Sequence, residues 1–160
     1  DGVDMALGYT TYKTPNAIYL LKNDLTGKEG CGVKLLYGDQ GKIDVATTTT
    51  DVPYAVVTVG GASEDGTYPG PVAQSSLEVV DQLGCVVQVS ISVNGGVNAG
   101  DFLVIDPSEA NGTFTSSGNI TLAVGDWLWG YALTTCQPGE QCVMRFQPQY
   151  FFSTYVPPAP

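Results

Sequence analysis

Residues 88–106, with the sequence QVSISVNGGVNAGDFLVID, combine two strand patterns with two tight turns. Val89, Ile91 and Val93 alternate with polar residues, and this period of two predicts a half-buried strand with one apolar face. Two turns rich in Asn and Gly follow, because these residues accept the positive φ that a tight reversal requires. The apolar run at residues 102–105 predicts a second strand, which an Asp-Pro pair ends.

Short apolar runs separated by glycine-rich turns recur along all 160 residues. The hydrophobic content of 43%, together with 20 Gly and 10 Pro, indicates a packed chain with many turns rather than a disordered one. We therefore predict an all-β fold, a single compact barrel-like or sandwich-like domain of short antiparallel strands. The predicted domain spans residues 16–147, between extended arms at residues 1–15 and 148–160.

One segment, residues 72–83, fits a helix as well as a strand, because its apolar residues lie near both periods. We favour a strand, since a glycine and a further strand pattern follow directly.

The charge balance is acidic, with 16 Asp and Glu against six Lys and Arg and a net charge of −10. Such a surface repels phosphate backbones and anionic lipid, so we expect neither nucleic acid nor membrane as a partner. No apolar run approaches the roughly 20 residues of a spanning helix. The sequence opens at Asp1 rather than Met, which leaves open whether a leader or propeptide has been removed.

Histidine is absent from the chain, which removes Ser-His-Asp and Cys-His catalysis and histidine metal sites. No glycine fingerprint for phosphate is present either, so we predict no cofactor and no metal. Paired carboxylates could serve a glycosidase, with candidates at Glu64, Asp65, Glu78 and Asp81. Acidic residues are so frequent here that we expect no enzyme and no catalytic residue.

Three acidic residues, Asp101, Asp126 and Glu140, each follow a glycine and precede a strand pattern. A carboxylate in this position can accept the amide hydrogen bonds of the turn. We predict this turn role for all three rather than a catalytic one.

The four cysteines, Cys31, Cys85, Cys136 and Cys142, allow three complete pairings and lack metal-type spacing. We favour small buried thiols, because cysteine is among the most buried residue types. A Cys136–Cys142 disulfide across a hairpin is the alternative.

Aromatic residues concentrate near the C-terminus. Trp127, Trp129 and Tyr131 would line one face of a strand, as core or as a binding surface. Four more aromatic residues occupy the proline-capped C-terminal arm, which we expect to dock on its own domain or on a neighbour: Tyr150, Phe151, Phe152 and Tyr155.

The order and spacing of several strand and turn motifs, from about Tyr12 to Phe146, resemble the head decoration, or capsid cement, proteins of tailed bacteriophages. The matching motifs are Gly-Val-Lys-Leu (32–35), Gly-Lys-Ile-Asp-Val-Ala (41–46), Pro-Tyr-Ala-Val-Val (53–57), Val-Gln-Val-Ser-Ile (87–91), Ala-Gly-Asp (99–101), Gly-Tyr-Ala-Leu (130–133) and Pro-Gly-Glu-Gln-Cys-Val-Met-Arg-Phe (138–146).

This resemblance implies a non-enzymatic homotrimer on the outer capsid surface of the virion, assembled in the host cytoplasm, where major capsid protein subunits meet. Binding only the expanded lattice would stabilise it by mass action. The expected contacts to the major capsid protein are Tyr150, Phe151, Phe152 and Tyr155, with Trp127 and Trp129 as lesser candidates.

An extracellular carbohydrate-binding β-sandwich is the alternative function. In that case Trp127, Trp129 or Tyr131 would be exposed and would stack on sugar rings.

Overall fold

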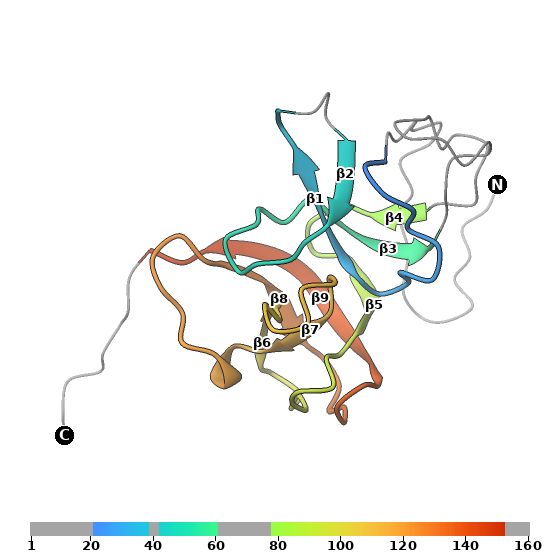
Figure 1. Cartoon of the computed structure of the whole chain (residues 1–160). Helices are drawn as coiled ribbons and strands as arrows, with labels where there is room; N and C mark the ends of the chain where they lie inside the picture. The colour runs from blue at the N-terminus through green and yellow to red at the C-terminus, as the bar shows by residue number, and fades with distance from the viewer. Residues whose placement is uncertain (1–20, 39–41, 61–77, 153–160) are drawn as a thin grey trace, which may run out of the picture.

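The computed structural model describes residues 21–38, 42–60 and 78–152. The predicted N-terminal arm, Tyr155, and the candidate acids Glu64 and Asp65 lie outside these ranges. Within them the chain forms two antiparallel sheets and one short 3₁₀ helix, η1 (Ser117–Asn119). The two sheets pack as a sandwich and do not close into a barrel within the described residues, so the all-β prediction is confirmed in its sandwich form (Figure 1).

The first sheet has four strands in the order β2-β1-β3-β4. Their bounds are β1 (Gly32–Leu36), β2 (Lys42–Val45), β3 (Ala55–Val59) and β4 (Glu78–Val80). β4 confirms the strand prediction for the described part of residues 72–83, since residues 72–77 lie outside the description.

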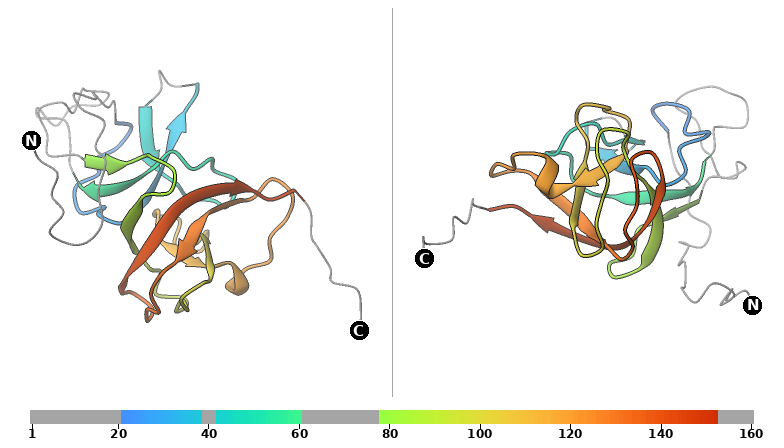
Figure 2. Two further views of the ribbon diagram at one scale, coloured as in Figure 1. Left: turned by 180° about the vertical axis from the view of Figure 1, so that it is seen from behind. Right: turned by 90° about the horizontal axis from the view of Figure 1, so that it is seen from below.

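The second sheet has five strands in the order β5-β9-β8-β6-β7. Their bounds are β5 (Val86–Ser90), β6 (Phe102–Ile105), β7 (Phe114–Ser116), β8 (Trp127–Ala132) and β9 (Gln141–Tyr150). Figure 2 shows β9 as the long strand that crosses this sheet toward the C-terminal end. β9 continues through Pro148 to Tyr150, so the boundary predicted at residue 148 falls inside a strand.

The main core lies between the two sheets and contains the largest buried side chains, Trp129, Phe114 and Phe146. The first three residues of β3, Ala55, Val56 and Val57, are all apolar because this part of the strand is buried on both faces. Val56 belongs to the core between the sheets, whereas Ala55 and Val57 belong to a second cluster on the other side. The four-stranded sheet is therefore covered on both sides.

Residues 88–106 form two strands, as predicted, but these strands do not pair with each other. β5 pairs with β9, and β6 pairs with β7 and β8. Val89 and Ile91 are buried, but Val93 is 69% exposed, so its predicted place on the apolar face is wrong. The chain leaves the ladder after Ile91, and the buried Ser92 hydroxyl donates to the Asp106 carboxylate.

All four cysteines are free and buried in the structure. This agrees with the favoured interpretation of buried thiols. The hairpin disulfide is not formed in this state.

Candidate interaction surface

Three aromatic side chains, Trp127, Tyr150 and Phe152, gather where β8 begins and β9 ends. We call them the aromatic cluster. The Trp127 and Tyr150 rings meet edge to face with centroids 5.2 Å apart, and the Tyr150 and Phe152 rings do so at 5.0 Å. Exposure rises along the cluster, from half-buried Trp127 to 38% at Tyr150 and 76% at Phe152. Edge-to-face packing fixes the rings while leaving apolar surface in contact with water.

The strand register places the first pair of the cluster. Trp127 lies directly opposite Tyr150 in the β8–β9 ladder, so their side chains share one face of the sheet. Two backbone hydrogen bonds continue the pairing beyond the strand ends, from Phe151 N to Asp126 O at 2.9 Å and from Gly125 N to Phe151 O at 3.2 Å. The backbone that carries the aromatic cluster is therefore held by hydrogen bonds between β8 and β9.

The turn before β8 is held by the Asp126 carboxylate. It accepts hydrogen bonds from Ala123 N at 2.7 Å and from the Thr49 hydroxyl at 2.7 Å. Thr49 also accepts a hydrogen bond from Trp127 N through its carbonyl oxygen at 2.8 Å. The first residue of the aromatic cluster is thus anchored to the loop between β2 and β3.

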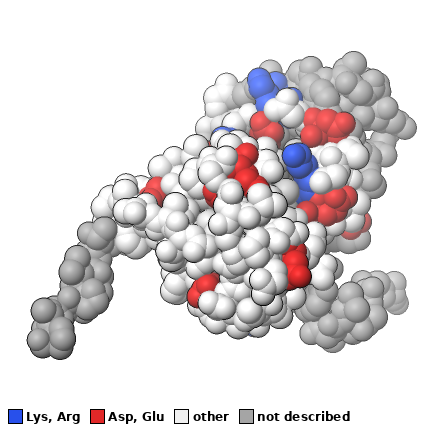
Figure 3. Space-filling model, turned by 60° about the horizontal axis from the view of Figure 1, so that its bottom comes forward, with Lys and Arg blue, Asp and Glu red and all other residues white. Residues whose placement is uncertain are grey.

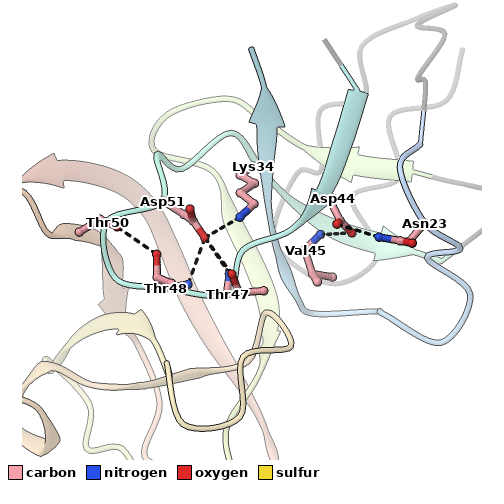
Figure 4. A network of polar contacts seen from close by, with 8 residues as sticks. All are labelled: Asn23, Lys34, Asp44, Val45, Thr47, Thr48, Thr50 and Asp51. Carbon is pink, nitrogen blue, oxygen red and sulfur yellow. Dashed lines mark hydrogen bonds and ion pairs between the residues drawn. The ribbon is translucent and has the colours of Figure 1, made fainter. Parts of the chain in front are cut away.

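This loop has its own carboxylate anchor, Asp51, which Figure 4 shows at the centre of a polar network. Its Oδ2 atom accepts from Thr47 N at 2.8 Å, from Thr48 N at 3.0 Å and from Lys34 Nζ at 3.1 Å. Burial alone would raise the pKa of the Asp51 carboxyl, but these donors outweigh it and lower the pKa. Lys34 belongs to β1, so the network connects the four-stranded sheet to the loop that supports Trp127.

The predicted turn role of the three acids is confirmed. Besides Asp126, Asp101 accepts from Asn98 N at 2.9 Å, and Glu140 accepts from Gln137 N at 2.8 Å. In each case the carboxylate binds the amide three residues earlier, which is the local bonding expected of a turn residue.

The part of the chain that contains the aromatic cluster carries few charges. Between residues 110 and 152 the charged residues are Asp126, Glu140 and Arg145. Val124, beside the cluster in sequence, is 63% exposed. Figure 3 shows a face on which uncharged side chains cover most of the described area and charged ones gather mainly toward the top of the view. An exposed apolar group with little charge suits contact with a protein partner.

The structure brings together three of the six predicted contact residues. Phe151 is half-buried and tied through its backbone, and Tyr155 lies outside the described residues. Trp129 is wrong as a contact residue, because it is fully buried with ring centroids 5.4 Å from Phe114 and 6.3 Å from Phe146. Its indole N–H has no hydrogen-bond partner among the described residues.

Tyr131 does not share the face of Trp129, contrary to the expected aromatic ladder. The β8–β9 register shifts between Leu128 and Gly130, opposite the part of β9 that contains Pro148. Proline lacks the N–H that a regular ladder needs, so a strand tolerates it at such an irregularity. After the shift Ala132 joins the core, and Tyr131 pairs with Arg145 and stays half-buried.

Sequence reasoning missed Val124 and Thr49 as parts of the site. Val124 is a single apolar residue before a turn, and nothing in its pattern indicates exposure. Thr49 lies 77 positions from Asp126, and only the folded chain brings them together.

Within the three described ranges, no group of three or more His, Cys, Asp and Glu side chains is arranged to hold a metal ion. Of the four candidate glycosidase acids, the description includes Glu78, the first residue of β4, and Asp81, just after that strand. Among the described residues, no helix is long and apolar enough to cross a membrane.

No protein-family model matches the chain, and no curated protein matches its sequence.

Proposed function

We propose that this chain is a capsid decoration protein that binds the outer surface of an expanded phage head, at junctions between major capsid protein subunits. The observation that carries the proposal is the aromatic cluster, a set of partly exposed rings at the end of the longest described strand. Aromatic residues are enriched at protein interfaces and dominate their binding energy.

Rigidity supports the same function. The aromatic cluster is fixed by the β8–β9 ladder, by the Asp126 turn and by Thr49, so little conformational entropy remains to be lost on binding. A decoration protein gains from this, because each bound copy stabilises the expanded lattice by mass action over many equivalent sites.

An acidic composition and a trimeric assembly both agree with a position on the outer surface of a capsid. An outward-facing protein with a net charge of −10 has little affinity for packaged DNA. Three copies around a capsid junction would present three aromatic clusters together, which raises the total affinity without requiring a large contact from each copy.

Co-sedimentation of the full chain with expanded, DNA-free heads tests the proposal, with unexpanded heads as the control. We expect saturable binding to expanded heads, a whole-number ratio to the major capsid protein, and a higher melting temperature of the decorated heads. Absence of binding to expanded heads would refute the decoration function. Quenching of Trp127 fluorescence by oligosaccharides would instead favour the carbohydrate-binding alternative.

A further inference from the structure

The turn between β8 and β9 holds two thiols against a single residue, Thr134. The Thr134 hydroxyl lies 3.4 Å from the Sγ atom of Cys136 and 3.4 Å from that of Cys142. The Cys142 thiol donates to the Thr134 carbonyl oxygen at 3.1 Å. The two sulfur atoms therefore share the Thr134 hydroxyl as a neighbour, and the two thiols are within hydrogen-bond reach of each other.

The backbone holds the two cysteines in place independently of their sulfur atoms. Cys136 exchanges two hydrogen bonds with Val97, at 2.8 and 2.9 Å. The turn between the cysteines is closed by a bond from Glu140 N to Gln137 O at 3.1 Å. A disulfide between Cys136 and Cys142 would thus join two ends of a turn that the backbone already closes.

We propose that Cys136 and Cys142 form a reversible disulfide when the protein meets a small-molecule disulfide oxidant. The thiolate of Cys136, which is 6% exposed against 1% for Cys142, attacks the oxidant and releases one equivalent of its thiol. Cys142 then loses its proton and attacks the mixed disulfide, releasing the second equivalent. Two thiols of the protein are oxidised and the oxidant is reduced to two thiols.

The environment of Cys142 agrees with its place in the second step. Burial raises the pKa of the Cys142 thiol to about 11, and a hydrogen bond with the Cys136 thiol adds to the shift. A thiol that resists ionisation is a poor first nucleophile, and it must lose its proton before it can attack the mixed disulfide beside it. Cys31 and Cys85 are buried too, but neither thiol makes a hydrogen bond among the described residues.

The bond would close the turn that already contacts Ile91 and Ser92 through backbone hydrogen bonds. Gly139 N donates to Ser92 O at 3.1 Å, and Ile91 N donates to Glu140 O at 2.9 Å. Cross-linking removes open states of the unfolded chain, so the oxidised protein should melt about 5 °C higher than the reduced protein.

In the test, the full chain is incubated with oxidised glutathione and its remaining free thiols are blocked in denaturant. The protein is then digested with a protease that cleaves after Glu. Cleavage after Glu140 separates the two cysteines, and cleavage after Glu29, Glu64, Glu78 and Glu109 leaves Cys31 and Cys85 in two other peptides. We expect peptide 110–140 linked to peptide 141–160, and loss of the link in dithiothreitol. Blocked thiols at both positions, or links that include Cys31 or Cys85 in equal yield, would overturn the proposal.

Matched variants connect the bond to stability. Cys136→Ser should abolish the oxidant-dependent rise in melting temperature, whereas Cys85→Ser should keep it. A rise that persists in Cys136→Ser would contradict the assignment. If Cys136→Ser does not fold, the peptide map of the natural sequence still shows whether Cys136 and Cys142 are linked.

Discussion

Thr49 donates its hydroxyl to the Asp126 carboxylate at 2.7 Å, although 77 positions separate the two residues. This contact joins the loop that follows β2 to the turn that precedes β8. It makes the position of Trp127 depend on the four-stranded sheet as well as on its own strand.

Replacing Thr49 by valine keeps the volume of the side chain and removes this bond. We expect a loss of about 1–2 kcal/mol in the free energy of unfolding, because the acceptor is a charged, buried carboxylate. Urea unfolding measures the loss. Thr50→Val is the control, since the Thr50 hydroxyl contacts the exposed Thr48 hydroxyl at 3.0 Å. Equal effects of the two variants would show that the hydrogen bond to Asp126 does not contribute to the free energy of unfolding.

Trp129 should matter for stability and not for binding. Trp129→Ala leaves a large cavity between Phe114 and Phe146, so we expect a loss of about 3–5 kcal/mol. Trp129→Phe should lose much less, because it keeps an aromatic ring and removes the indole N–H that has no partner among the described residues. Urea unfolding separates the variants. A Trp129→Phe variant as unstable as Trp129→Ala would show that the indole makes a bond.

At Gly130 the backbone of β8 lies close against β9. A Cβ atom at this position would stand 1.9 Å from the Arg145 carbonyl oxygen, so one strand must move to admit it. We expect Gly130→Ala to lower the free energy of unfolding by about 2 kcal/mol or more. Gly38→Ala is the control, because a Cβ at Gly38 meets nothing within 4 Å. Thermal unfolding of both variants checks the difference.

The stability of the fold should depend on pH through Asp106, which directly follows β6. Burial alone would raise the pKa of its carboxyl, but hydrogen bonds from Ser108, Ser92 and Asn94 outweigh it and lower the pKa to about 2. Because the pKa is lower in the folded than in the unfolded chain, the stabilisation is present above pH 4 and is lost as pH falls toward 2.

Solvent screening limits this contribution of Asp106 to about 1 kcal/mol. Asp106→Asn should therefore be less stable than the natural sequence at pH 7 and should lose less stability between pH 4 and pH 2. Urea unfolding over this range tests both statements, and parallel pH profiles of the two proteins would contradict them.

Local signals predicted much of this fold because they act over a few residues. The alternation of Val89 and Ile91 marked β5, and the glycine-acid pairs marked the turns at Asp126 and Glu140. Burial on both faces, as in the first half of β3, corresponds to three successive apolar residues.

Long-range pairing could not be predicted in the same way. No local pattern states that β5 pairs with β9, which lies far along the chain, rather than with β6, the next strand in sequence. The β8–β9 register shifts between Leu128 and Gly130, opposite the part of β9 that contains Pro148, and this irregularity between two distant strands has no local sequence signal. Trp127 and Trp129 therefore looked equivalent in sequence, although one belongs to the surface cluster and the other to the core.

The most direct test of the account measures the affinity of Tyr150→Ala/Phe152→Ala for expanded heads. These residues are partly exposed, so the double variant should fold normally and should bind at least about 30-fold more weakly, as expected for interface residues worth 2 kcal/mol. The control is Tyr37→Ala, which removes a 79% exposed ring in the turn that follows β1, and this variant should bind like the natural sequence. A double variant that binds expanded heads with unchanged affinity would contradict the assignment of the aromatic cluster as the capsid contact.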